Sequence, residues 1–538
     1  MAKGFRPVDR DQPFLLPPDM REWLPEGHLA WFVIDAVGAL DLSLFAARKT
    51  PRGSWAGRAA YDPRMLLALL VYGYAAGVRS SRRIERACWE DVAFRVICAG
   101  DVPDHATVAR FRREHFADPE AVGGLFGQVL VLAARAGLGR LGLIAVDGTK
   151  IAAAASKDAN RTERRLRELA AQILAEAEAV DAAEDELYGE ARGDELPQEL
   201  ADPKTRAERI RTALAELEAE RQAAGAERDA QARAYLEAVG SGKPPRGQAP
   251  AAVAVTAARR RLARAEAAQR AKVAAWQAQR AAEDAAGIKR GPGGRKPFGP
   301  EAHAGVAKAR AALERAEGKA ADTERKAAAA KGPGPVRNLT DPDSRLMPIR
   351  GGGFLQGYNA QATHSADGLC LGTSVTASTT DYASFEPMMR QAEAAAAVLR
   401  THAPGPLHRR RARIGRMLGD AGYCSEHNLT CPGPDRLIAT GKHRDLEKAA
   451  HGGNGPGPPA HSQATAAMAA RLATPQGMAA YRRRGPLAEG PFGDIKHNRG
   501  FRRFSMRGLP RANGEWAFQN TVTNLLKIHA TGWAPAQA

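Results

Sequence analysis

The sequence has few cysteines and no long apolar run, and both absences restrict the class of protein. The five cysteines are scattered and none forms a CxxC pair, which argues against a disulfide framework or a structural zinc site and fits a reducing cytosol. No run of 18 apolar residues occurs, and the N-terminus lacks the apolar segment of a signal peptide. We therefore expect a cytoplasmic protein that does not contact a membrane.

Acidic residues are outnumbered by basic ones. The chain has 78 Lys and Arg against 60 Asp and Glu, a net charge of +18 and a pI near 9.9. This excess indicates a polyanionic partner, most commonly nucleic acid, because each neutralised phosphate releases counterions. The alternative is that the charge serves only solubility. A chain of 538 residues exceeds one compact core, so about two to four domains are expected.

Residues 1–137 are expected to form a helical domain. The apolar stretch Met65–Gly77 predicts a buried helix that ends at Gly77. Ser80 and Ser81 can cap a second helix, RRIERACWEDVAFRVI, and Asp104 or Thr107 can cap a short basic one. Together these helices are similar to a helix-turn-helix DNA-binding arrangement, with an ordinary helical bundle as the alternative.

Alanine, glutamate, arginine and lysine dominate residues 158–335. Leucine and isoleucine at helical spacing predict two antiparallel helices in a coiled-coil hairpin, broken by Gly/Pro-rich stretches. A partly disordered linker is the alternative for some of this region. Strand-like sequence lies on both sides, in residues 138–157 and 336–538. We therefore expect an α/β core split by a helical insertion, which costs little free energy if the ends of the insertion lie close together.

Short apolar runs and turn residues predict the strands of this core. Asp147-Gly148 is expected to be the turn between two short strands, and residues 365–368 the turn of a hairpin. A further strand is expected to end at Asp420, followed by a helix capped by Ser425. The last hundred residues are expected to be helical.

Asp147 and Asp420 are the candidate catalytic acids. Each follows an apolar run beside a small residue, at the strand ends where open α/β sheets place ligands. Two carboxylates aimed at one point repel unless cations lie between them, and hard oxygen ligands select Mg²⁺ or Mn²⁺. Two such ions can activate an attacking oxygen and stabilise the leaving 3′-oxygen of a phosphodiester. Taken singly, each aspartate could instead be a turn residue.

Several motifs are spread along almost the whole chain. They are FRPVDRDQPFLLPPDMREWLPEGHLAWFVIDAV, PDHATVARFRREH, IAVDGTKI, NLTDPDSRLM, GFLQGYNAQATHSADG, LGDAGYCS and AEGPFGDIKHNRGFRRFSMRGL. With these motifs the chain resembles a bacterial insertion-sequence transposase of the DDE class. The resemblance implies an RNase H-like catalytic core in which Asp147, Asp420 and Glu489 hold two Mg²⁺ or Mn²⁺ ions. It also implies metal-dependent cleavage of DNA at the element ends, then strand transfer into target DNA.

The same resemblance implies DNA-binding residues near Glu489. Lys496 lies seven residues after Glu489, two helical turns away, so both would share a face and the lysine would approach DNA. Tyr481 and Arg484 match the upstream Tyr and Arg of the family signature. One of the two arginines before Arg484 could replace it, and Tyr481 could instead be a packing residue.

The C-terminal basic run completes the predicted site. Four arginines are expected to neutralise backbone phosphates: Arg499, Arg502, Arg503 and Arg507. Four apolar residues are expected to anchor this surface: Phe492, Ile495, Phe501 and Phe504. The family usually has Glu-Pro where this chain has Glu489-Gly490-Pro491, and because proline favours a first helical turn, the helix is expected to begin after Glu489. Asp494 and Glu515 are the rival third acids.

The expected partner is double-stranded DNA, at the terminal inverted repeats and at the target, bound by a homodimer whose N-terminal helices read sequence. Bound protein would be associated with the nucleoid. No nucleotide cofactor is expected, because the Gly-rich stretches lack the GxxxxGK[ST] pattern. His364, His427 and His497 are not at metal-motif spacing and are expected at the surface or at phosphates. The alternatives are a non-catalytic DNA-binding protein derived from such an element, and a coiled-coil assembly protein.

Overall fold

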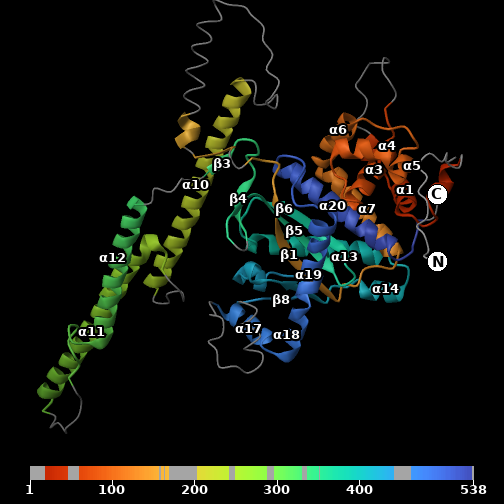
Figure 1. Cartoon of the computed structure of the whole chain (residues 1–538). Coiled ribbons are helices and arrows are strands. Elements are labelled where there is room, and N and C mark those ends of the chain that lie inside the picture. The colour runs from red at the N-terminus through yellow and green to blue at the C-terminus, as the bar shows by residue number, and fades with distance from the viewer. Residues whose placement is uncertain are drawn as a thin grey trace, which may run out of the picture. The chain divides into compact units, whose positions relative to one another are not determined.

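The computed structural model describes residues 19–46, 60–156, 159–162, 164–168, 203–241, 249–287, 296–329, 336–349, 352–441 and 462–535 (Figure 1). The fold is mixed α/β, as the sequence predicts. The chain divides into two compact units, one of Met1–Asn160 with Asn338–Ala538 and one of Arg161–Arg337. The first part of the N-terminal motif, before Asp19, lies outside the described residues.

Short helices form the N-terminal part of the first unit. They are the 3-10 turn η1 (Met20–Glu22), α1 (Leu29–Gly38), α2 (Ser43–Ala46), α3 (Pro63–Ala75), α4 (Ser81–Glu90), α5 (Val92–Ile97), α6 (His105–Phe116) and α7 (Pro119–Arg135). α3 is the expected buried helix, and Gly77 follows it with a φ of +75°. The sequence predicts one helix over α4 and α5, but it breaks at Asp91, whose carboxylate accepts the N–H groups of Ala93 and Phe94 and so starts a new helix.

A mixed sheet lies at the centre of the first unit. Its strands are β1 (Leu143–Ala152), β4 (Arg345–Pro348), β5 (Phe354–Ser365), β6 (Cys370–Thr376), β7 (Arg416–Gly419) and β8 (Asp435–Ile438). The order is β4-β5-β1-β7-β8, and β6 pairs with the same edge of β5 as β4, further along the strand. β5 is antiparallel to its neighbours, whereas β1, β7 and β8 are parallel. The β5–β6 hairpin turns at the residues that the sequence indicates.

β1 runs unbroken through Asp147 and Gly148, so the expected turn between two strands is wrong. β5 pairs with β1 over Ile144–Ala152, and this ladder continues through the glycine. A Cβ at Gly148 would collide with the side-chain amide of Gln361. Close packing across the ladder therefore explains the glycine, and Asp147 lies within a strand and not at its end.

Helices cover the sheet and form the C-terminal part. They are α13 (Phe385–His402), α14 (Pro406–Arg411), α15 (Glu426–Thr430), α17 (Gln463–Leu472), α18 (Pro475–Arg482), α19 (Arg484–Gly493) and α20 (Leu509–His529), with the 3-10 turns η4 (Tyr382–Ser384) and η5 (Ala421–Tyr423) and the π-helical turn η6 (Asp494–Asn498). Ser425 caps α15 as predicted, accepting the Asn428 N–H at 3.1 Å.

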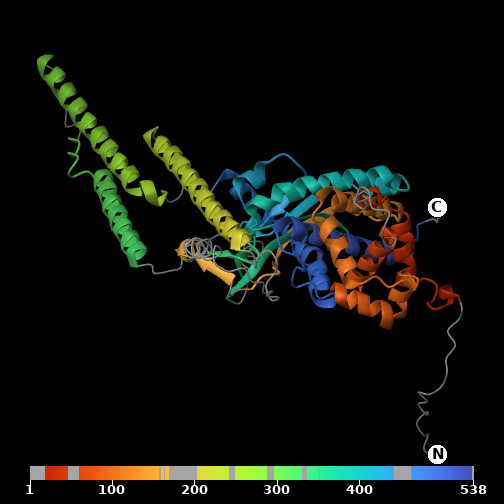
Figure 2. The same ribbon diagram turned by 90° about the horizontal axis from the view of Figure 1, so that it is seen from above.

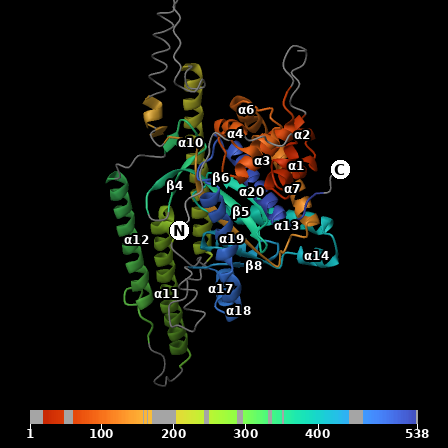
Figure 3. The ribbon, with the colours of Figure 1, turned by 45° about the vertical axis from the view of Figure 1, so that its right-hand side comes forward.

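α20 packs between the N-terminal helices and the sheet (Figure 3). Phe518 contacts the rings of Tyr74 and Phe116, at centroid distances of 5.1 and 4.6 Å. On the sheet side, Trp516 Nε1 donates to the Gln361 carbonyl at 2.8 Å. One core therefore joins the N-terminal helices to the sheet.

The second unit contains long, Ala-rich helices. They are α10 (Pro203–Gly240), α11 (Ala254–Ala285) and α12 (Ala304–Ala329), with the 3-10 turn η3 (Ala251–Val253). The paired strands β2 (Asn160–Thr162) and β3 (Val336–Asn338) contain the residues at which the chain passes from one unit to the other. α11 and α12 lie side by side and antiparallel (Figure 1 and Figure 2), and ion pairs of 2.9 Å (Arg259–Glu317) and 3.6 Å (Arg310–Glu266) join them. The described residues thus hold three long helices where the sequence predicts two, and most of the Gly/Pro-rich breaks lie outside these residues.

In the described parts of the chain, no single helix is long and apolar enough to cross a membrane. The bent pair α6 and α7, which meet at 89°, passes that test together on length and composition.

Candidate active site

Asp147 and Asp420 occupy matching positions on neighbouring parallel strands. Ala145 of β1 is paired with Leu418 of β7, and each aspartate lies two residues beyond its member of that pair. Side chains two residues apart on a strand point to the same face, and adjacent strands are about 4.8 Å apart. β7 ends at Gly419, so the pairing between β1 and β7 stops just before the two aspartates, while β1 stays paired with β5. The sequence predicted that these two acids would meet, and the strand register is the reason that they do.

Glu489 reaches the same place from α19, which packs on β1 and β5. The guanidinium of Arg484 joins the acids, with Nη1 3.0 Å from Asp147 Oδ2 and Nη2 3.3 Å from Glu489 Oε1. The helix begins at Arg484, before Glu489, and contains Pro491. The prediction of a helix that begins after Glu489 is therefore wrong. Pro491 lies in the last turn of α19, directly before the π-helical turn η6.

The electrostatic environment of Asp147 favours a bound cation. Burial raises the pKa of the Asp147 carboxyl, the charge of Asp420 raises it further, and Arg484 and the Gly148 N–H oppose the shift without cancelling it. The side chain of Asp147 is 16% exposed, whereas that of Glu489 is 62% exposed. The site thus holds more negative charge than Arg484 compensates.

This donor set fits divalent cations of the Mg²⁺ type. Asp147, Asp420 and Glu489 offer only carboxylate oxygens, the ligands that hard cations prefer. A cationic group, the Arg484 guanidinium, already lies between two of them. Hard-metal binding is therefore chemically consistent with the residues that meet here.

Two charged residues that the sequence analysis missed border the site. Asp381 follows β6, and its Oδ1 lies 3.7 Å from Nζ of Lys150 on β1. Burial lowers the pKa of Lys150, against the charges of Asp381, Asp420 and Asp147. Asp381 lies at the N-cap position of the turn η4, where an aspartate commonly accepts a backbone N–H. In the structure its side chain makes no such hydrogen bond.

Tyr481 and Lys496 both lie at the site. Tyr481 is buried beside Arg484, and burial raises the pKa of its hydroxyl, an effect that Arg484 opposes. Lys496 Nζ donates to Thr149 Oγ1 and, at 3.1 Å, to the Lys150 carbonyl. Burial lowers the pKa of the Lys496 ammonium. Strand β1 therefore fixes the head of this lysine at positions two and three residues beyond Asp147.

The four arginines of the C-terminal run differ in position. Arg499 is only 4% exposed and pairs with Asp494 at 2.9 Å and with Thr523 Oγ1 at 2.8 Å, so it does not fit the predicted phosphate contact. Arg502, Arg503 and Arg507 are exposed. Arg503 and Arg507 line a pocket of about 660 Å³ with Ser156 and Ser505 among its other residues. The reason for the difference is α20, which covers Arg499.

The apolar anchor and the rival acids have clear positions. The four anchor residues are buried: Phe492, Ile495, Phe501 and Phe504. Asp494 pairs with Arg499. Glu515 is buried in the core, where it accepts the Tyr74 hydroxyl at 2.8 Å and the Ser505 hydroxyl at 2.6 Å. Neither rival joins Asp147 and Asp420, whereas Glu489 is joined to Asp147 through Arg484.

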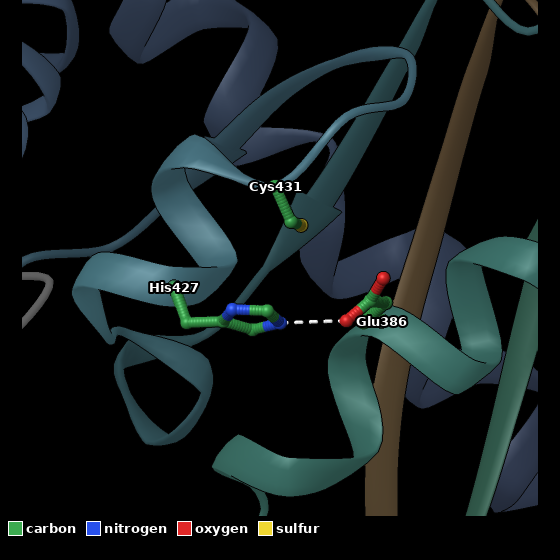
Figure 4. A group of neighbouring side chains, drawn as sticks. All are labelled: Glu386, His427 and Cys431. Atoms are coloured by element: carbon green, nitrogen blue, oxygen red, sulfur yellow. Dashed lines mark hydrogen bonds and ion pairs between the residues drawn. The ribbon is translucent and has the colours of Figure 1, made fainter.

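A second group of possible ligands lies on α13 and beside α15. Glu386, His427 and Cys431 have ligand atoms within 4.8 Å of one another, and Figure 4 shows them facing a common point. His427 Nε2 lies 2.6 Å from Glu386 Oε2, and Arg436 Nη1 donates to Cys431 Sγ at 2.9 Å. A thiol and an imidazole suit softer metals than Mg²⁺, so this group differs chemically from the carboxylate site.

The three histidines do not share one environment. His364 is fully buried, and burial lowers its pKa to about 3, so its predicted place at the surface is wrong. Its ring packs edge-on against Phe492 at 5.6 Å. His427 is exposed and pairs with Glu386, and His497 is exposed beside Arg502.

Comparisons with known proteins give two family matches. Residues 18–114 match a family described as a transposase domain (DUF772), and residues 457–529 match one described as a transposase DDE domain. No curated protein and no solved structure matches the chain. The second matched segment spans α17 to α20 and includes Tyr481, Arg484, Glu489 and Lys496. The two matches, a transposase domain near the N-terminus and a transposase DDE domain near the C-terminus, support an insertion-sequence DDE transposase.

Proposed function

We propose that this transposase cleaves DNA at the ends of its element and transfers the freed strand into target DNA. The observation that carries the proposal is the meeting of Asp147, Asp420 and Glu489, which come from β1, the end of β7 and α19. Hydrolysis would free a 3′-hydroxyl, and that hydroxyl would then attack a target phosphodiester and displace its 3′-oxygen. A non-catalytic DNA-binding protein, the rival role, would have no need for these carboxylates to lie close together.

An RNase H-like core is part of this proposal. Its support is the strand order β6-β5-β1-β7-β8, in which an antiparallel β1-β5-β6 meander is extended by two strands parallel to β1. α13 forms the crossover between β6 and β7. In this proposal residues 138–157 and 336–538 form the catalytic core, 158–335 the coiled-coil insertion and 1–137 the DNA-binding domain.

Asp147, Asp420 and Glu489 would hold two Mg²⁺ or Mn²⁺ ions. When bound, such ions would activate the attacking oxygen and stabilise the leaving one. Arg484 draws Glu489 toward Asp147 and limits the repulsion between the acids. Lys496 presents a positive charge at Thr149 and Lys150 of β1, where it would hold a DNA phosphate.

DNA contacts outside the carboxylate site are proposed for the exposed basic residues. Arg502, Arg503 and Arg507 follow η6 directly and would neutralise backbone phosphates, while the N-terminal helices read sequence. A homodimer on DNA is proposed because an element has two ends to be processed together.

A cleavage assay on DNA that carries the element ends tests the proposal. Full-length protein should cut with Mg²⁺ or Mn²⁺, and Asp147→Asn, Asp420→Asn and Glu489→Gln should each abolish cutting. Glu515→Gln is a matched control that removes a carboxylate outside the site. Cutting that survives all three substitutions would refute the catalytic role, and wild-type protein that binds the ends without cutting would support the non-catalytic rival.

A further inference from the structure

Asp381 occupies the position of a helix cap without acting as one. It stands directly before η4, where an aspartate usually accepts a backbone N–H, yet its side chain makes no capping hydrogen bond. Its carboxylate turns instead toward the centre of the sheet. A helix start that forgoes its cap indicates that the carboxylate is used elsewhere.

One oxygen of this carboxylate is held by amide donors from β5. Oδ1 accepts Asn359 Nδ2 at 2.6 Å and Gln361 Nε2 at 2.8 Å, with Lys150 Nζ at 3.7 Å. Asn359 and Gln361 are both fully buried and point to the same face of β5. Fixed donors of this kind are typical of the shell that orients a metal-binding carboxylate.

The other oxygen faces Asp420. A Cβ added to Gly422 would lie 3.0 Å from Asp420 Oδ1 and 3.2 Å from Asp381 Oδ2, so the two oxygens flank the glycine. A Cβ at Gly148, next to Asp147, would lie 2.9 Å from Asp381 Oδ1. The glycines beside the two catalytic aspartates thus both lie against the Asp381 carboxylate, Gly148 on its Oδ1 side and Gly422 on its Oδ2 side.

A buried phenol lies close enough to all three aspartates to be affected by their charges. Tyr423 is fully buried, and its hydroxyl donates to Gln361 Oε1. Burial raises the pKa of Tyr423 well above its ordinary value, and the charges of Asp147, Asp381 and Asp420 raise it further. Asp381 therefore belongs to the same cluster of charges as the proposed metal ligands.

We infer that Asp381 is a fourth carboxylate of the metal site, which binds a divalent ion through Oδ2 together with Asp420 while Asn359 and Gln361 hold Oδ1. This inference rests on the proposed function, because it concerns the same ions. The competing explanation is structural: Asp381 would serve only to pair with Lys150 and to satisfy two buried amides.

Binding of Mn²⁺ to the full chain, measured by electron paramagnetic resonance of the free ion, separates these explanations. Asp381→Asn should weaken at least one Mn²⁺ site by about tenfold or more, since even residues that only orient a ligand cost that much. The control Glu393→Gln removes the same charge from α13, where Glu393 pairs only with Arg390 on the exposed side among the contacts described. Its Mn²⁺ affinity should equal that of the wild type.

Gly422→Ala provides a second variant that removes no charge. Its methyl group would enter the space between Asp420 and Asp381, and Mn²⁺ affinity should fall. Gly485→Ala on α19 is the matched control, because a Cβ there meets nothing within 4 Å. Unfolding temperatures in EDTA complete the test: Asp381→Asn should be at least as stable as the wild type, since one of several neighbouring negative charges is gone.

The outcomes distinguish this inference from the proposed function. Unchanged Mn²⁺ affinity in Asp381→Asn, with a loss in Asp420→Asn, would overturn the inference and leave the function intact. A lower unfolding temperature in EDTA with unchanged Mn²⁺ affinity would establish the structural explanation. Wild-type protein that binds no Mn²⁺ would refute the metal site as a whole.

Discussion

Asp147→Asn should stabilise the metal-free protein while it abolishes metal-dependent cleavage. Three effects act on the Asp147 carboxylate: burial and the charge of Asp420 disfavour its ionised form, and Arg484 at 3.0 Å favours it. Because the net effect raises the pKa, the neutral amide should suit the folded state better than the carboxylate. Each unit of such a shift corresponds to about 1.4 kcal/mol, so Asp147→Asn should gain stability in proportion to the shift.

The pH dependence fixes the sign of this effect. A carboxyl whose pKa is higher in the folded state costs nothing below its unfolded pKa, near 3.9, where both states are protonated. The cost grows as pH rises and is complete above the folded pKa. The difference in stability between Asp147→Asn and the wild type should therefore be near zero at low pH and reach a plateau toward neutral pH.

The assay is thermal unfolding in EDTA across this pH range. Asp435→Asn is the control, because its expected effect on stability is opposite to that of Asp147→Asn. Burial raises the pKa of Asp435, but hydrogen bonds from Arg416 and Arg471 outweigh it and lower the pKa overall. Its stabilising effect is present above its unfolded pKa and is lost as pH falls, so Asp435→Asn should destabilise at neutral pH. If Asp147→Asn also unfolds at lower temperature than the wild type at neutral pH, the ion pair with Arg484 outweighs burial and repulsion, and our reasoning fails.

Further predictions concern DNA contacts, the core and the second ligand group. Replacing Arg503 and Arg507 by glutamine should lower the slope of log binding constant against log salt by about 2, about one unit per lost phosphate contact, in filter-binding titrations; an unchanged slope would contradict these contacts. Glu515→Gln should cost about 1–3 kcal/mol in denaturant unfolding, because it leaves buried donors of Tyr74 and Ser505 poorly matched, and should not alter Mn²⁺ affinity. Cys431→Ser should leave Mn²⁺ affinity and cleavage unchanged; a loss of either would link that group to the catalytic ions.

Local sequence is sufficient to predict those features of the fold that depend on a single short segment. The buried helix before Gly77, the hairpin after β5 and the cap at Ser425 depend on residues within a few positions of each other. Asp147 and Asp420 were found in the same way, because each stands beside an apolar run and a small residue. The third acid is harder to predict from local sequence, because Glu489 is joined to Asp147 only through Arg484 in the folded chain.

Partners distant in sequence explain the failures. Asp147-Gly148 has the composition of a turn, but pairing with β5 keeps it in a strand. Arg499 lies in a basic run, yet α20 covers it and supplies Thr523 as its partner. Asp381 is not singled out by the sequence, because its partners Asn359 and Gln361 lie 22 and 20 residues away. In the first two cases the local pattern was real and a tertiary contact overrode it.

The insertion between β1 and β5 also delays the pairing of these two strands during synthesis of the chain. The two strands form the central ladder of the sheet but are separated by roughly 200 residues, so at about 5–20 residues per second β1 leaves the ribosome some 10–40 s before its partner. During that interval β1 has no β5 to pair with and its apolar residues are open to aggregation. In the insertion, α11 and α12 are joined by ion pairs, and the strands β2 and β3 at its two ends pair with each other. Once these contacts form, the loop that must close to bring β1 and β5 together is effectively shorter. Early folding of the insertion would therefore set the rate at which the catalytic sheet assembles on the nascent chain.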